Sequence, residues 1–163
     1  MTGTQSDLDA LRKAAHDRDH EQIQYLLKRL VMRLPFYHAL AIAVERAHAY
    51  APTFERYYPD ATWARQVLVY IATVGQTPGE LPPEAMREYS SPGSGNFVKA
   101  VFDLGNAAHQ EHQMEARLGY LVSALVNVVM AELVEAWYAD KLADWERARG
   151  NQVDPATDRK SVV

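Results

Sequence analysis

The stretch that decides the fold is LGYLVSALVNVVMAELVEAW, residues 118–137. Its apolar residues recur at helical spacing, and they are Leu118, Leu121, Val122, Leu125, Val126, Val129, Leu133 and Trp137. Together they cover most sides of the helix. A helix that is apolar on most sides is normally buried by its neighbours. The stretch therefore predicts an all-α multi-helix bundle, or stacked helical hairpins, around a central apolar C-terminal helix.

The same stretch does not predict a membrane span. Its most apolar part, residues 118–131, is shorter than the ~20 residues that a membrane-spanning helix needs. It also contains Ser123 and Asn127, and Glu132 and Glu135 follow at once. We therefore expect a core helix, with Ser123 and Asn127 in a buried hydrogen-bond network and no membrane partner.

Four further helices are expected upstream, over residues 6–15, 23–34, 35–51 and 60–74. The polar turn 16–19 joins the first two into a hairpin. Pro35 suits the first turn of the third helix, and Pro52 is expected to end it. Asp60 is the expected N-cap of the fourth helix and Gly75 its C-cap. The stripe that this fourth helix buries is Trp63, Val67, Tyr70, Ile71 and Val74.

Most of the prolines and glycines after Gly75 lie within residues 76–96, so we expect a long irregular segment there. No proline occurs over residues 97–149, and one straight helix of that length would be about 80 Å long at ~1.5 Å per residue. A break is expected in the apolar-poor stretch 109–115. Gly150 is expected to end the last helix. Residues 1–150 then form a single α-helical domain, and 151–163 form a polar tail that we expect to be disordered.

Composition places the chain among ordinary globular proteins. It has 163 residues, 48% of them hydrophobic and 23% charged, with a net charge of −4. Cysteine is absent, which excludes disulfides, thiolate catalysis and cysteine-based metal sites. The N-terminus shows no apolar signal segment, so we expect a cytoplasmic protein.

The histidines are the natural candidates for metal binding in a chain without cysteine. Glu45 and His48 match the Glu-x-x-His spacing of carboxylate-bridged bundles, but no second copy of that spacing exists. The metal-ligating candidates are His48, His109, His112 and Glu132. Solvated or boundary histidines are the competing interpretation, and no cofactor is predicted.

Glu132 is the most informative single carboxylate, because apolar residues share its side of the last helix. Burying an unpaired carboxylate is costly, so it should meet a cation or a metal, or keep its proton. It is either a functional acid, base or ligand, or the partner of an arginine on a neighbouring helix or at a subunit interface.

A second hypothesis concerns nucleic acid. The first hairpin carries the basic residues Arg12, Lys13, Lys28, Arg29 and Arg33, and phosphate binding needs clustered cations. Interleaved aspartates on the same hairpin favour a mixed, solvated surface instead.

Aromatic residues are more numerous than a core of this size requires, and Tyr and Trp are favoured where a surface meets a partner. Tyr57, Tyr58, Trp137 and Trp145 are the interface candidates, and Tyr57, Tyr58 and Trp145 are expected to be partly exposed.

Signatures of known enzyme classes are lacking. The leading hypothesis is a non-enzymatic helical interaction or assembly subunit. It would form a homo-oligomer or join a larger complex through the C-terminal helix and the 76–96 segment. A nucleic-acid-contacting subunit and a metal-dependent helical-bundle enzyme are the alternatives.

Overall fold

The computed structural model describes residues 2–153, and within that range the chain is all-helical, as predicted. The α-helices are α1 (Thr2–His16), α2 (His20–Val31), α3 (Phe36–Tyr57), α4 (Trp63–Val74), α5 (Ser94–Ala107), α6 (Met114–Trp137) and α7 (Ala139–Val153). A 3₁₀ turn, η1, spans Pro83–Met86. The part of the predicted tail beyond residue 153 lies outside the described residues.

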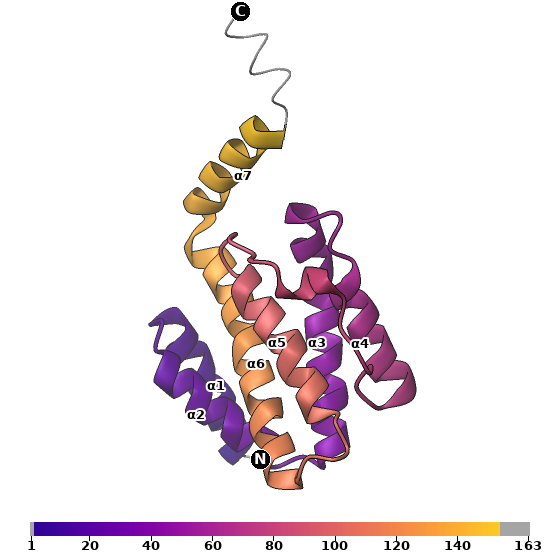
Figure 1. Cartoon of the computed structure of the whole chain (residues 1–163). Helices are drawn as coiled ribbons and strands as arrows, with labels where there is room; N and C mark the ends of the chain where they lie inside the picture. Colours follow the sequence, from indigo (N-terminus) through magenta and orange to yellow (C-terminus); the bar gives the residue numbers. More distant parts are fainter. Residues whose placement is uncertain (1, 154–163) are drawn as a thin grey trace, which may run out of the picture.

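The apolar helix α6 is the centre of the bundle. It contacts α2, α3 and α5, and Figure 1 shows it between the α1–α2 hairpin on one side and α5 and α3 on the other. Helix α4 packs on α3 and α5 at the outer edge. The largest fully buried side chains include Phe54, Phe97, Leu104 and Leu121, from α3, α5 and α6. The prediction of a central C-terminal helix is therefore confirmed.

Helix α6 also satisfies the length and hydropathy test for a membrane span. It has 24 residues, and its most apolar 18-residue window has a mean hydropathy of 1.6 and is 44% buried inside the structure. The core helix of a globular bundle passes the same test. One such helix is weak evidence for a membrane, and here it packs against three other helices.

The expected polar network on α6 is present. Ser123 Oγ donates a hydrogen bond of 2.6 Å to Asp103 on α5, and Asn96 of α5 donates one of 3.1 Å to Asn127. Asp103 also pairs with Lys99 on its own helix. These contacts fix the register of α5 on α6, because apolar packing alone tolerates sliding.

Helix α3 does not end at Pro52, contrary to the prediction, but runs on to Tyr57. A proline inside a helix removes one backbone hydrogen bond and costs about 3 kcal/mol. Burial beyond it compensates, because Phe54 is fully buried with its ring 4.9 Å from Phe97 and 5.0 Å from Tyr89. Pro52 itself lies on the exposed side.

The ends of α4 match the prediction in part. Gly75 is the C-cap, in the left-handed conformation at φ 78°. The N-cap is Thr62, without a side-chain hydrogen bond, so the expectation for Asp60 was wrong. Asp60 lies instead within the turn that the Ala61 amide closes on the Tyr58 carbonyl.

The break expected between residues 109 and 115 is confirmed, since α5 ends at Ala107 and α6 begins at Met114. A second break, at Tyr138, was not predicted. It changes the direction of the chain so that Leu142 is buried and Trp145 of α7 lies against Tyr57 at the end of α3. Helix α7 also continues past Gly150 to Val153, because a glycine in an exposed helix costs only about 1 kcal/mol.

At the start of α5 the backbone lies close to α6 and to a side chain of α3. Gly93, its N-cap, has φ 88°. A Cβ built on Gly93 would lie 2.8 Å from the Ala131 carbonyl oxygen of α6 and 2.8 Å from the Tyr50 hydroxyl of α3. Only glycine fits this junction of three helices.

Candidate functional site: an apolar helix face and a cleft beneath α7

The metal-ligating candidates do not come together. The rings of His109 and His112 are 4.6 Å apart in the turn before α6, whereas His48 lies on α3. Glu132 accepts hydrogen bonds of 2.7 and 2.6 Å at its two oxygens from Arg46 Nη2. Across residues 2–153, no group of three or more potential metal ligands is found. Of the two roles considered for Glu132, the structure shows the second, in which an arginine on a neighbouring helix neutralises the carboxylate.

The basic candidates of the first hairpin are largely paired within it. Arg12 pairs with Asp9, and Lys13 pairs with Asp17. Arg29 and Arg33 both contact Asp7, at 3.2 and 2.7 Å. The surface is thus one of alternating charge, and nucleic-acid binding by this hairpin stays a prediction.

Tyr57 and Tyr58 are buried, with exposed fractions of 3% and 8%, so the expectation that they are partly exposed was wrong. The cause is α7, whose Trp145 ring lies 5.1 Å from Tyr57 and 5.6 Å from Tyr58. Trp145 is itself half-buried, as expected. Trp137 is half-buried too, with the Arg18 guanidinium 5.1 Å from its ring.

Helix α4 has apolar residues on both sides. Its inner side buries Val67, Leu68 and Ile71. Tyr70 and Val74, predicted to be buried, are exposed, because α4 packs through a narrower arc than its apolar residues cover. Val69 points the opposite way from the buried side and is 46% exposed, and Val74 is 49% exposed. We call the exposed residues 69, 70 and 72–74 the α4 face.

The α4 face is also uncharged. No charged residue occurs between Arg65 and Glu80. Arg65, at the N-terminal end, donates three hydrogen bonds from its Nε and Nη2 to Glu55, the shortest 2.7 Å. This ion pair keeps its charge directed toward the chain's own α3.

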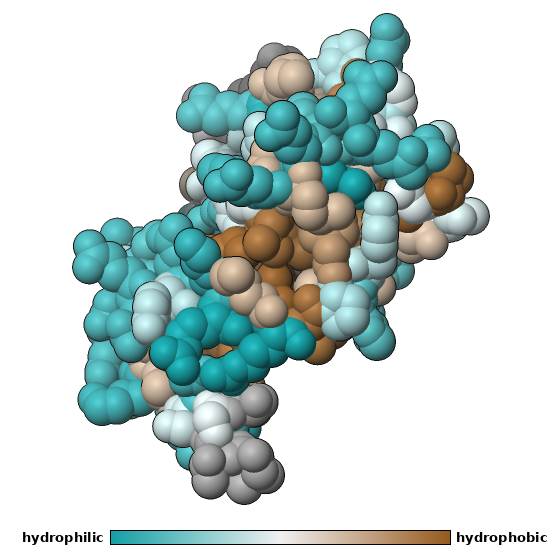
Figure 2. Space-filling model, turned by 90° about the horizontal axis from the view of Figure 1, so that it is seen from below, coloured by the Kyte–Doolittle hydropathy of each residue, from teal (hydrophilic) through white to brown (hydrophobic). Residues whose placement is uncertain are grey.

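A groove of about 470 Å³ separates the α4 face from α3. Apolar side chains form most of its walls, including Leu40, Val44, Leu68 and Ile71, with Glu45 and His48 at its edge. Its end at Tyr37 belongs to the lower end of the bundle in Figure 1, where α3 begins. Figure 2 views the molecule from that end and shows apolar residues gathered in a central hollow, with hydrophilic residues around them.

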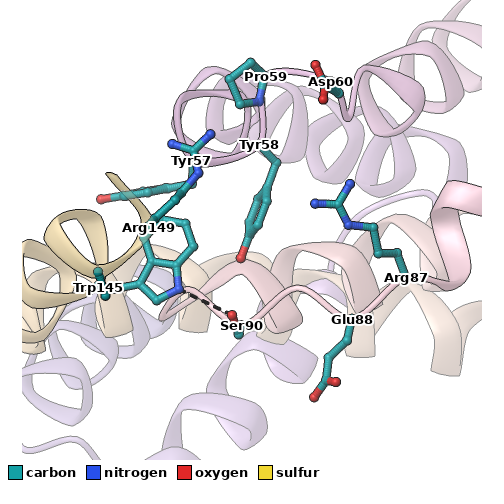
Figure 3. A pocket seen from close by; sticks show the side chains of 10 residues that line it. Tyr57, Tyr58, Pro59, Asp60, Arg87, Glu88, Ser90, Trp145 and Arg149 are labelled. Atoms are coloured by element: carbon teal, nitrogen blue, oxygen red, sulfur yellow. Dashed lines mark hydrogen bonds between the residues drawn. The ribbon is translucent and has the colours of Figure 1, made fainter. Parts of the chain in front are cut away.

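The second site is a cleft of about 520 Å³ beneath α7 (Figure 3). We call it the α7 cleft. Its lining comes from three segments: the end of α3, the extended stretch after η1, and α7. These residues are Tyr57, Tyr58, Pro59, Asp60, Arg87, Glu88, Ser90, Trp145, Ala148 and Arg149.

Hydrogen bonds fix the aromatic walls of the α7 cleft. The Ser91 amide donates to the Tyr58 hydroxyl at 2.8 Å, and Trp145 Nε1 donates to Ser90 Oγ at 3.3 Å. Burial raises the pKa of Tyr58, but the hydrogen bonds from Ser91, Ser94 and Ser90 outweigh it and leave the pKa lowered. Tyr58 and Trp145 are therefore each held by a hydrogen bond to the segment that follows η1.

Comparison with protein-family models, curated proteins and solved structures found no match to this chain. Function is therefore inferred from the chain's own residues.

Sequence reasoning missed the most distinctive members of both sites. Val69 could have been found, because it adds an apolar residue to the polar side of an otherwise amphipathic helix. Arg87 and Arg149 carry no such signal, since one lies in an irregular segment and the other on a helix whose direction depends on the break at Tyr138.

Proposed function

We propose that this protein is a helical assembly subunit that self-associates, with the α4 face as the contact between two copies. The observation that supports the proposal is that the outward side of α4 is both apolar and uncharged. Apolar residues on the outward side of a helix are normally covered by a neighbour, and within residues 2–153 Val69, Tyr70 and Val74 are left exposed.

The absence of charge favours a second copy of the chain as the partner. In a two-fold dimer, residues near the axis face their own copies, so any charge there would repel itself. The exposed Val69 and Val74 avoid that repulsion. The α3–α4 groove beside them offers an apolar recess that the partner's Tyr70 is suited to fill, because aromatic side chains are favoured anchors at interfaces.

The test is the oligomeric state of the full chain, measured by sedimentation equilibrium over a micromolar concentration series. The unmodified protein should form a dimer. Val69→Lys places two positive charges at the axis and should shift the protein to monomer. Met86→Lys is the matched control, because Met86 is a 76% exposed apolar residue outside both sites, and it should leave the dimer intact.

Circular dichroism and a thermal melt show whether each variant is folded. A clean monomer for the unmodified protein at high micromolar concentration would overturn the proposal. A dimer that survives Val69→Lys in a folded protein would show that the contact lies elsewhere.

A further inference from the structure

The α7 cleft contains cations that the protein itself does not neutralise. Most arginines elsewhere on the surface pair within the chain, as Arg56 does with Glu135 and Arg147 with Asp144, although Arg18 lies over the Trp137 and Tyr138 rings instead. Arg87 and Arg149 form no ion pair within residues 2–153; their guanidinium groups lie over aromatic rings of the cleft instead. Arg87 lies between the Tyr89 ring, at 5.4 Å, and the Tyr58 ring, at 5.9 Å, and Arg149 is 5.8 Å from the Trp145 ring.

Figure 3 shows how these groups are arranged. The two guanidinium groups lie on either side of the Tyr58 ring, with the Trp145 indole next to Arg149. A guanidinium that is stacked on a ring keeps its N–H donors directed outward from the ring edge. Such donors bind a carboxylate or a phosphate group in a two-pronged geometry.

The acidic residues of the α7 cleft restrict what it can hold. Asp60 lies at one rim beside Pro59, and Glu88 points away from Tyr58 on the opposite side from Arg87 (Figure 3). Neither carboxylate forms an ion pair with Arg87 or Arg149 within residues 2–153, but both add negative charge to the lining of the cleft. A polyanion such as a nucleic acid would meet both carboxylates, whereas a small ligand with one anionic group can contact the arginines alone.

We infer that the α7 cleft binds a small organic anion, namely a planar ring that carries one carboxylate or phosphate group. The anionic group lies by Arg87 and Arg149, and the ring packs against the half-buried Trp145, since Tyr58 is only 8% exposed. The volume of about 520 Å³ is within the ~300–1,000 Å³ range of small-molecule sites. The lining of the α7 cleft combines aromatic side chains with several charged and hydroxyl-bearing ones, and it is more polar than the α3–α4 groove.

Binding should also stabilise the position of α7. One wall of the cleft is α7 itself, which is held to the rest of the bundle by the buried Leu142 and by the contacts of Trp145 with Tyr57, Tyr58 and Ser90. A ligand that contacts both walls adds to those contacts, because it binds only the docked arrangement. The fluorescence of Trp145 should therefore change when a ligand occupies the cleft.

The experiment titrates the full chain with four probes at constant ionic strength: benzoate, phenyl phosphate, inorganic phosphate and phenol. Amide chemical shifts and Trp145 emission are followed, with Trp145→Phe to identify the emission of that residue. Benzoate or phenyl phosphate should bind with millimolar affinity or better, and the stronger of the two identifies the anionic group. Inorganic phosphate and phenol, which each lack one half of the ligand, should bind at least about tenfold more weakly.

Arg87→Gln and Arg149→Gln should each weaken binding of the preferred probe about tenfold or more, the usual cost of a lost charged hydrogen bond. Arg147→Gln is the matched control, because Arg147 lies on α7 as Arg149 does, is exposed and pairs with Asp144. It should leave binding unchanged. Failure of both ring-bearing anions to bind would overturn the inference. So would equal binding of phenol, or binding that survives both arginine substitutions.

Discussion

Gly93→Ala tests the junction of α3, α5 and α6 directly. Two separate costs arise at this position. The first is conformational: at φ 88° an L side chain costs roughly 1–2 kcal/mol relative to glycine. The second is steric: the new Cβ would lie 2.8 Å from the Ala131 carbonyl oxygen and from the Tyr50 hydroxyl, and overpacking of this kind costs about 1–3 kcal/mol. The expected loss in the free energy of unfolding is therefore about 2–5 kcal/mol.

Two other glycines separate these costs. Gly75 also has a positive φ, of 78°, but a Cβ added there would meet nothing within 4 Å, so Gly75→Ala should lose only about 1–2 kcal/mol. Gly95 has neither constraint and lies in the first turn of α5. Gly95→Ala should be neutral or stabilise the protein by up to about 1 kcal/mol.

Urea denaturation followed by circular dichroism measures all three variants on one scale. The m-value should be unchanged, so that the midpoint shifts report stability. Adding Tyr50→Phe to Gly93→Ala removes one of the two clashing atoms and should recover part of the loss, which is a departure from additivity expected for residues in contact. If Gly93→Ala loses no more than Gly75→Ala, then α5 does not approach α6 as closely as described.

Three further predictions concern single side chains. Burial raises the pKa of Tyr50 above its usual value of 10, so the folded protein keeps this proton while the unfolded chain loses it. Stability should therefore fall as the pH rises past about 10, by up to about 1.4 kcal/mol per pH unit from this group, and urea titrations of Tyr50→Phe should show a smaller fall. Glu132→Gln removes a partly exposed ion pair with Arg46 and should cost at most about 1 kcal/mol, with the difference shrinking in high salt; a loss of several kcal/mol would point to a different role for this carboxylate. Trp145→Ala should leave the melting of the bundle nearly unchanged but increase hydrogen exchange of α7 amides, and unaltered exchange would contradict the docking of α7 through this side chain.

The helices that have a long repeating pattern of apolar residues were predictable from the sequence. The apolar residues of α6 recur at helical spacing, and the break before α6 coincides with a stretch that has few apolar residues. The end of α3 was predicted wrongly because the local effect of Pro52 is outweighed by the burial of Phe54, whose partners come from α5 and from the segment after η1. Such partners are not visible in a local window of sequence.

The candidate sites were less predictable for the same reason. The pairing of Glu132 with a cation on a neighbouring helix was among the expected outcomes, but its partner Arg46 could not be selected without the packing of α3 on α6. Tyr57 and Tyr58 were expected to be partly exposed because nothing local shows that Trp145 of α7 lies against them. The α7 cleft is assembled from three segments that are distant in the sequence, so no motif could mark it.

The separation of α2 and α6 along the sequence also sets an order of events during synthesis. The α1–α2 hairpin packs on α6, yet roughly 100 residues separate the end of α2 from the end of α6. At about 5–20 residues per second, the ribosome needs on the order of 5–20 s to supply that surface. During this interval the nascent hairpin has an apolar side with no native partner outside itself. Its exterior of alternating acidic and basic residues then helps to keep the growing chain from aggregating until its last helices emerge.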